Sequence, residues 1–231
     1  MINLTLRKLH RWLGFLAGLQ LLAWTVSGLY FTLIPIDEIR GNHLLTKEKS
    51  NKPTLSQLPV LSPYEIAIRN PDIADTQTSD LSLSVVLGRP IYLIGNNRYD
   101  ALSGEALPTI SRQEALSIVR ERVDAAITDV ELVEHVTIDS EYRSGELPAW
   151  QVTLREENTA IYVGLRTGRI RAVRTDSWRL FDFLWSLHIM DYEEREDFNH
   201  LLIQALAIIS LITVISGLML FFTTLRYQSK Q

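Results

Sequence analysis

The 231-residue sequence contains no cysteine, and this absence removes several classes of function. Without a thiol the chain has no disulfide, no thiolate ligand for zinc and no cysteine nucleophile. Oxygen and imidazole groups are therefore the strong metal ligands that remain. The sequence also lacks an excess of positive charge: its net charge is -4, whereas a face that binds nucleic acid must be basic to neutralise phosphates. Nucleic acid is therefore excluded as a partner.

The common catalytic signatures are missing as well. No G-x-S-x-G, H-E-x-x-H, G-x-x-x-x-G-K-[ST] or G-x-G-x-x-G pattern occurs. His135, Asp139 and Ser140 lie close in sequence, but residues that alternate along a strand need not converge, and nothing else marks a triad. We therefore expect no self-contained enzyme and no catalytic residue.

Two long apolar runs are present, at residues 13–36 and 201–222. In the first run the only strongly polar side chain is Gln20. About 24 residues rising ~1.5 Å each extend ~36 Å, which is enough to cross a ~30 Å hydrocarbon core. The run is too long for the apolar part of a signal peptide, and no A-x-A cleavage site follows it, so we interpret it as an uncleaved anchor. The sequence predicts two transmembrane helices.

Charged residues flank the two runs asymmetrically. Cations precede the first run and follow the second: Arg7, Lys8, Arg11, Arg226 and Lys230. Carboxylates stand at the opposite ends: Asp37, Glu38, Glu193, Glu194, Glu196 and Asp197. Because cationic flanks stay on the cytoplasmic side, both termini are predicted to be cytoplasmic. Residues 37–200 then lie outside the cytoplasm, which in a bacterium places them in the periplasm and the two helices in the inner membrane.

The region between the runs has the patterns of a folded domain on a linker. Residues 37–61 include a polar stretch rich in proline and serine, which is typical of a linker. Residues 111–127 have apolar positions at helical spacing, and Ser111 with Glu114 forms a capping box. Strand patterns follow at four places: 130–138, 149–154, 160–165 and 170–173. This half, residues 109–176, is predicted to be a helix followed by an antiparallel meander.

A weaker copy of the same order occupies residues 62–108. A short helix is predicted from Ser62, and strands are predicted at 81–87 and 91–94, so we interpret the two halves as a diverged internal repeat. The predicted fold class is α+β, with two antiparallel transmembrane helices, residues 1–36 and 200–231, flanking this tandem. The core of the second half should contain a set of large apolar residues: Ile118, Val119, Trp150, Ile161 and Val163.

Residues 177–199 follow the tandem, and they begin with a third apolar element. Helical spacing over 177–190 groups aromatic residues with a histidine on one face: Trp178, Phe181, Trp185 and His188. A second face is polar: Arg179, Asp182 and Ser186. We predict an amphipathic helix at the membrane interface, with its tryptophans at the lipid boundary and Arg179 in water. The carboxylates at 193–197 either hold a hard cation or favour the first turn of the second span, and the second interpretation is stronger.

Several stretches carry a resemblance to a known family. SRQEALSIVRERV, LPAWQVTL and AIYVGLRTGRI, between residues 111 and 170, resemble a PepSY domain. LHRWLGFLAGLQLLAWTVSGLYF at the first span, and LWSLHIMD with LITVISGLMLFF at the second, are similar to the PepSY-associated transmembrane family. The resemblance covers nearly the whole chain, although many relatives have four spans and this chain has two. It implies one of two functions. The first is an accessory role in membrane electron transfer or siderophore-iron reduction, which in some members involves haem b. The second is that of a membrane-anchored module that binds periplasmic peptides or proteins, as a peptidase inhibitor does.

Three histidines are the candidate haem ligands: His10, His188 and His200. His10 shares a helical stripe with Gly14 and Gly18, and small residues let a neighbouring helix or a flat ring come close. The spans also share an ending, TVSGL in the first and TVISGL in the second. Taken alone, a histidine at a membrane boundary is more often an interfacial residue than a ligand.

The resemblance adds haem ligation as an alternative to the interfacial interpretation. On this hypothesis His10 and His188 bind the metal of haem b on opposite sides of the bilayer, His200 is a weaker candidate, and Arg7 and Arg11 meet the propionates of the inner haem. Two spans are few for two haems, so a homodimer or a partner membrane subunit is expected.

Overall fold

A computed structural model describes residues 2–46, 59–73, 75–137, 140–143 and 145–228. Most of the predicted linker, residues 47–58, lies outside the described residues. The chain divides into two compact units, one formed by residues 1–36 with 179–231 and the other by residues 37–178. Short helices complete the described chain: α2 (Ile36–Ile39), η1 (Asn42–Leu44), η3 (Pro71–Ile73), η4 (Thr78–Asp80) and η5 (Glu156–Asn158).

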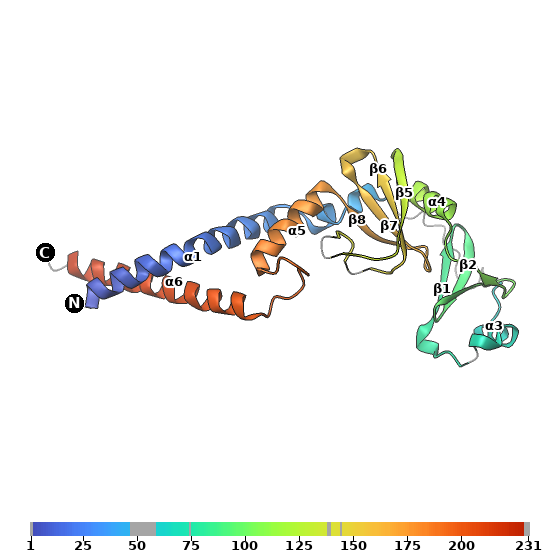
Figure 1. The fold of residues 1–231 in the computed structure, drawn as a ribbon, viewed down its shortest axis with the longest axis horizontal. Coiled ribbons are helices and arrows are strands. Elements are labelled where there is room, and N and C mark those ends of the chain that lie inside the picture. The colour runs from blue at the N-terminus through green and yellow to red at the C-terminus, as the bar shows by residue number, and fades with distance from the viewer. Residues whose placement is uncertain (1, 47–58, 74, 138–139, 144, 229–231) are drawn as a thin grey trace. The chain divides into compact units, whose positions relative to one another are not determined.

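The unit formed by residues 37–178 contains two antiparallel sheets (Figure 1). The strands of the first are β1 (Leu81–Val86), β2 (Arg89–Ile94), β3 (Asn97–Asp100) and β4 (Ala106–Leu107). The strands of the second are β5 (Ile127–Val133), β6 (Ala149–Leu154), β7 (Ala160–Gly164) and β8 (Ile170–Arg174). Strands that follow one another in sequence are neighbours in each sheet, so both sheets are meanders. The α+β class with antiparallel sheets is confirmed.

One helix precedes each sheet, and the two helices begin in the same way. Before α3 (Pro63–Arg69) the pair Ser62 and Glu65 forms a capping box, and Ser111 and Glu114 form one before α4 (Arg112–Arg122). In each box the serine hydroxyl accepts from the glutamate amide while the glutamate side chain accepts from the serine amide, which satisfies donors that a first helical turn leaves without partners.

The predicted extent of the helix at 111–127 is wrong at its C-terminal end. α4 ends at Arg122, Val123 is extended, and Ile127 already starts β5. The carbonyl of Arg122 accepts a hydrogen bond of 2.7 Å from the amide of Thr46, which stops the helical ladder. An apolar residue at position 127 suits a strand as well as a helix, so spacing alone did not separate the two elements.

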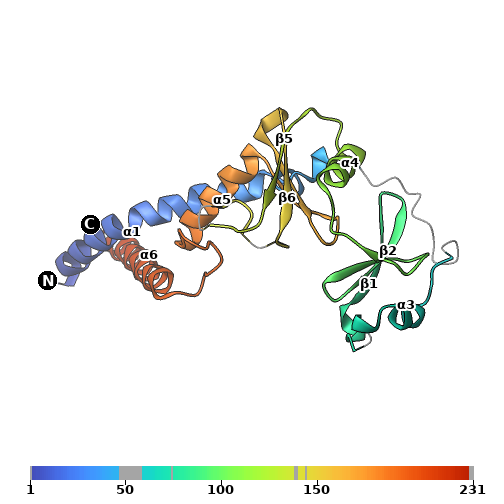
Figure 2. The same ribbon diagram turned by 45° about the vertical axis from the view of Figure 1, so that its right-hand side comes forward.

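The main hydrophobic core joins α4 to both sheets (Figure 2). Ile118 and Val119 of α4 pack with Ile161 and Val163 of β7, and all four are buried, which confirms their prediction as core residues. The first sheet contributes Val86, Ile91 and Leu93. Trp150 lies half-buried at the edge of this core and donates from Nε1 to the carbonyl of Ile110 at 2.7 Å. The two halves therefore share this core, and the first half has a further hydrophobic cluster of its own.

The other unit consists of α1 (Ile2–Leu33), the C-terminal part of α5 (Asp176–Ile189) and α6 (Leu201–Gln228). α1 and α6 run side by side, and both chain termini lie at the same end of the pair (Figure 1). Within the described residues, α6 carries one apolar run long enough to cross a membrane, Leu201–Leu225, and the apolar run of α1, Ala17–Leu33, is shorter. The pairing is antiparallel, as predicted.

α5 corrects one sequence prediction. Asp182 and Ser186, which were expected on a polar outer face, are buried at 6% and 3% exposure, whereas Leu180 and Phe183 are 48% and 55% exposed. Asp182 is ion-paired with Arg195, and this partner allows a carboxylate to turn inward. The helix therefore presents apolar side chains outward and polar ones inward, the reverse of a helix that faces water.

Candidate functional site

His10 of α1 binds α6 through one ring nitrogen. Its Nδ1 lies 2.8 Å from Ser216 Oγ and 3.1 Å from the carbonyl of Thr213. The ring lies over Gly217, where an added Cβ would come within 3.0 Å of His10 Cε1. A glycine is therefore needed for this close approach between the helices.

His188 of α5 binds α1 in the same manner. Its Nδ1 lies 2.7 Å from Ser27 Oγ, and Ser27 is fully buried. Aromatic rings surround the imidazole: the ring centroid of Phe31 lies 5.5 Å away, and those of Trp24 and Trp185 each lie 6.3 Å away. The environment of this histidine is apolar apart from the serine.

The oxygens beside each Nδ1 bear on where the imidazole proton lies. For His10 one of them is the carbonyl of Thr213 at 3.1 Å, which can only accept, so the proton lies on Nδ1. For His188 the same tautomer lets Ser27 donate to the carbonyl of Ala23 at 2.7 Å and accept from the imidazole. The Nε2 atoms of His10 and His188 then carry lone pairs, and no contact of a described residue engages them.

His200 differs from the other two histidines because both of its nitrogens are engaged. Its Nε2 lies 3.0 Å from the carbonyl of Ile189, which can only accept, and its Nδ1 lies 3.5 Å from the amide of Ile203. A carbonyl partner places the proton on Nε2, the nitrogen that a haem iron would need. His200 therefore does not present a lone pair as a ligand.

The last three carbonyls of α5 are each capped by a side chain, two from α1 and one from His200, which precedes α6. Gln20 Nε2 donates to Leu187 at 3.0 Å, Trp24 Nε1 donates to His188 at 2.7 Å, and His200 bonds Ile189. The final turn of a helix has no internal partners for these groups, so side-chain donors are required where water is scarce. Gln20, the polar residue of the first apolar run, is thereby explained as a cap.

The structure does not bring the predicted ligands together. Ser27, which binds His188, follows His10 by 17 residues (27 minus 10) on the same helix, or about 26 Å along its axis. Among the described residues, no group of three His, Asp or Glu side chains could hold a metal ion. Arg7 and Arg11, one turn from His10 or adjacent to it, have exposed side chains. Each histidine would therefore need a second ligand from elsewhere.

The acidic residues before α6 form a loop rather than its first turn, so that part of the sequence prediction is wrong. α6 begins at Leu201 and has no acidic residue in its first turn. The carboxylate of Asp191 instead accepts hydrogen bonds from the amides of Glu193, Glu196 and Asp197. An open cavity of about 410 Å³ lies beside this loop and is lined in part by His200.

The amphipathic helix also places its tryptophans at specific protein contacts. Trp185 donates from Nε1 to the carbonyl of Arg195 at 3.1 Å. In the other unit the guanidinium carbon of Arg174 lies 3.9 Å from the ring centroid of Trp178, a cation–π contact. Arg179 is half-buried. The ring of each tryptophan therefore has a partner within its own unit.

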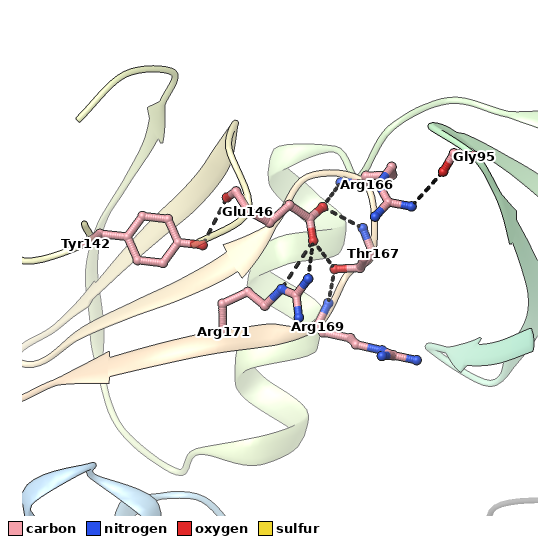
Figure 3. Close-up of polar contacts among 7 residues, drawn as sticks. All are labelled: Gly95, Tyr142, Glu146, Arg166, Thr167, Arg169 and Arg171. Carbon is pink, nitrogen blue, oxygen red and sulfur yellow. Dashed lines mark hydrogen bonds and ion pairs between the residues drawn. The ribbon is translucent and has the colours of Figure 1, made fainter. Parts of the chain in front are cut away.

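A polar cluster around Glu146 was missed by sequence reasoning (Figure 3). Its carboxylate accepts hydrogen bonds from the amides of Arg166 and Thr167, from Thr167 Oγ1 at 2.7 Å and from the guanidinium of Arg171. Burial alone would raise the pKa of Glu146, but the bonds from Thr167 and Arg166 and the charge of Arg171 outweigh it, so the pKa is lowered. Arg166 also donates to the carbonyl of Gly95 at 3.0 Å. This cluster anchors the turn before β8 to the first sheet.

Sequence reasoning also missed the roles of Ser27 and Ser216, although both lie in a motif that the sequence repeats. Each is the serine of the ending that the two apolar runs share, TVSGL at 25–29 and TVISGL at 213–218. The repeated pattern marks the residue that binds a histidine of another helix in both cases.

An apolar helical unit that turns polar groups inward, joined to a folded α+β unit, defines a membrane-associated protein with a globular domain. The chain belongs to the family described as the PepSY-associated TM region, whose model matches residues 7–231. No curated protein and no solved structure matches the chain.

Proposed function

We propose that the protein is a two-span bacterial inner-membrane protein that binds haem b and acts as an accessory component of transmembrane electron transfer, such as iron or siderophore reduction. On this proposal both termini are cytoplasmic and the α+β unit is periplasmic. The observation that carries it is the state of two histidines, His10 and His188, each of which presents an Nε2 lone pair beside the apolar helices.

The inverted polarity of the helical unit supports its placement in a bilayer. Asp182, Ser186, Ser210 and Ser216 are buried, whereas leucine and phenylalanine side chains cover the outer surface. In water this arrangement would leave a large apolar surface exposed, but in lipid the same surface is solvated, and Asp182, Ser186 and Ser216 have partners inside. The apolar run of α6 is long enough to span the hydrocarbon core.

The hydrogen bonds of His10 and His188 support ligation. A metal-binding histidine commonly donates its second ring N–H to an oxygen, which fixes the tautomer and the ring orientation. Ser216 and Ser27 are such acceptors for His10 and His188. His200 lacks this arrangement, because its Nε2 is taken by Ile189, and we leave it out of the ligand set.

The remaining residues suit the periphery of an inner haem site. Arg7 and Arg11 are exposed near His10 and would neutralise propionates, and an added Cβ on Gly18 would meet no atom within 4 Å. A further ligand to the iron would come from a second copy of the chain or from a partner membrane subunit. When bound, haem supplies one-electron transfer, and His188 lies about 26 Å along α1 from His10, toward the opposite side of the bilayer.

The experiment is an optical spectrum of the full-length protein, expressed with ample haem and purified in detergent. A Soret band that shifts on reduction, with haem quantified per chain, is the expected result. His10→Ala and His188→Ala should each lower the haem content, and added imidazole should restore the band. His43→Ala and His135→Ala are matched controls, because both histidines are exposed in the α+β unit.

The outcomes separate the redox proposal from its alternative. If wild-type protein shows no Soret band, or if the four variants bind equal amounts of haem, the redox proposal is wrong. The membrane-anchored binding module would then replace it. The edge strand β5, which pairs with β6 on one side, is one of the sheet edges of the α+β unit to which a partner strand could be added.

A further inference from the structure

A cluster of cations on α1 lies beside the apolar end of α6. Close contacts set the register of the two helices at this point: a Cβ on Gly14 would lie 3.9 Å from Thr213 Cγ2, and His10 Nδ1 lies 2.8 Å from Ser216 Oγ. His10 is therefore level with the turn of α6 that contains Ser216.

The apolar run of α6 continues well beyond that level. It ends at Leu225, nine residues after Ser216 (225 minus 216), which is about 14 Å along the helix. The N-terminal end of α1 lies alongside the C-terminal end of α6 (Figure 1). Because the helices are antiparallel, the register set by His10 and Ser216 places Arg7 and Lys8 alongside this final part. In the same register, the positions of α6 level with Arg7, Lys8 and Arg11 lie about 9 to 15 Å along the helix before Leu225, the end of the apolar run.

No carboxylate side chain is available near these cations. Residues 1–36 and 198–231 contain neither aspartate nor glutamate. Arg7, Lys8 and Arg11 are all exposed, so their side chains lie on the outer surface of the helix pair.

The neighbouring surface of α6 is apolar and equally exposed. Met219 is 55% exposed, and Phe221 and Phe222 are each 58% exposed. Basic side chains at the edge of an apolar membrane segment are stable when their stems cover apolar surface and their charged ends reach an anion. In a bilayer the charged ends must reach toward the end of the run, where the anions are lipid phosphates, and each cation strengthens the attraction to anionic headgroups.

We propose that Arg7, Lys8 and Arg11, together with the exposed apolar end of α6, form a binding surface for the headgroups of anionic phospholipids. The phosphates accept hydrogen bonds from the cations, and the acyl chains cover Met219 and Phe222. The inference does not depend on the proposed function: the two propionates of one haem neutralise at most two of the three cations, and the third still requires an anion.

Trp12 provides the test, because it adjoins Arg11 and is 63% exposed. The full-length protein is reconstituted in vesicles of equal parts phosphatidylglycerol and phosphatidylcholine, with bromine on the acyl chains of one lipid or the other. The fluorescence of Trp12 is obtained as the difference between wild type and Trp12→Phe. Brominated phosphatidylglycerol is expected to quench it at least about twofold more than brominated phosphatidylcholine.

The triple variant Arg7→Gln/Lys8→Gln/Arg11→Gln should remove this preference. The matched control Arg112→Gln/Arg120→Gln/Arg155→Gln lowers the net charge equally at exposed positions of the α+β unit and should retain it. Equal quenching by the two lipids in wild type, or a preference that survives in the triple variant, overturns the proposal.

A second measurement uses wild type alone and does not depend on insertion of the variant. Raising the salt from about 0.05 M to about 0.5 M should reduce the preference, because screening weakens exposed charge pairs. A preference that is insensitive to salt would come from a different source and would also overturn the proposal.

Discussion

Ser27 Oγ lies 2.7 Å from His188 Nδ1 and also 2.7 Å from the carbonyl of Ala23 in its own helix. With its hydroxyl hydrogen directed at the carbonyl, Ser27 accepts from the imidazole when His188 carries its proton on Nδ1. One buried hydroxyl of α1 thus joins this helix to a histidine on α5.

Replacing this serine should loosen the helical unit. Ser27→Ala removes the acceptor of His188 Nδ1, and an unpaired polar group in an apolar setting costs about 1 to 2 kcal/mol. The measurement is thermal unfolding of the full chain in detergent, with Thr25→Ala as control, since the exposed Thr25 hydroxyl bonds only Leu21 of its own helix. Equal shifts for the two variants would contradict the role given to Ser27.

Trp24 should matter for its hydrogen bond as well as for its size. Trp24→Phe keeps an aromatic ring but removes the donor to the carbonyl of His188, which leaves a C-terminal carbonyl of α5 without its partner. We expect a loss of about 1 to 3 kcal/mol in the same unfolding assay. Trp12→Phe, at an exposed position of the same helix, should change stability by less than about 0.5 kcal/mol.

The carboxylate of Glu146 should stabilise the α+β unit. Glu146→Gln keeps one acceptor oxygen but loses the charge that binds Arg171 and the acceptor for Thr167 Oγ1. The expected cost is about 2 kcal/mol, typical of hydrogen bonds to a charged group. Urea unfolding followed by tryptophan fluorescence measures it, and the exposed Glu121→Gln is the control.

The lowered pKa of Glu146 predicts that the stability of the α+β unit depends on pH. The bonds from Thr167 and Arg166 outweigh burial and hold the pKa of Glu146 below 4.5, its value in an unfolded chain. A lowered pKa means that the stabilisation is complete above pH 4.5 and is lost as the pH falls through the folded value. The difference in the free energy of unfolding between wild type and Glu146→Gln should therefore be constant above about pH 5 and shrink below about pH 4. A difference that does not change with pH would contradict this assignment.

Truncating a side chain in the shared core should lower the free energy of unfolding more than truncating one at the rim of this core. Ile161→Ala removes a fully buried side chain between α4 and the second sheet, and we expect a loss of about 2 to 5 kcal/mol. Leu132→Ala, at a position 41% exposed on β5, should cost much less. Similar urea midpoints for both variants would show that the core is not packed as described.

Membrane topology can be tested with reporters fused after Gln231. On the proposed topology this end is cytoplasmic, because cationic flanks favour the cytoplasmic side. A C-terminal green fluorescent protein should be bright and a C-terminal alkaline phosphatase inactive, whereas alkaline phosphatase fused after Leu107, between the two halves, should be active. Phosphatase activity at Gln231 would reverse the proposed orientation.

Local patterns were enough to predict much of the secondary structure. The capping boxes at Ser62 and Ser111 mark the starts of α3 and α4, and the strand pattern at 149–154 coincides with β6. These features depend on residues within a few positions of one another, so spacing and side-chain chemistry determine them.

Only the tertiary structure decided which partner each polar group has. Asp182 was assigned to a water-facing side because amphipathic patterns assume water outside, yet it is buried against Arg195. Glu146 binds a turn about 20 residues away, and His10 meets Ser216 from the opposite end of the chain. The sequence by itself determined two apolar helices and an α+β unit with repeated helix starts. Their register, and hence the pairing of each histidine with its serine, arises from packing between residues far apart in sequence, which local patterns do not encode.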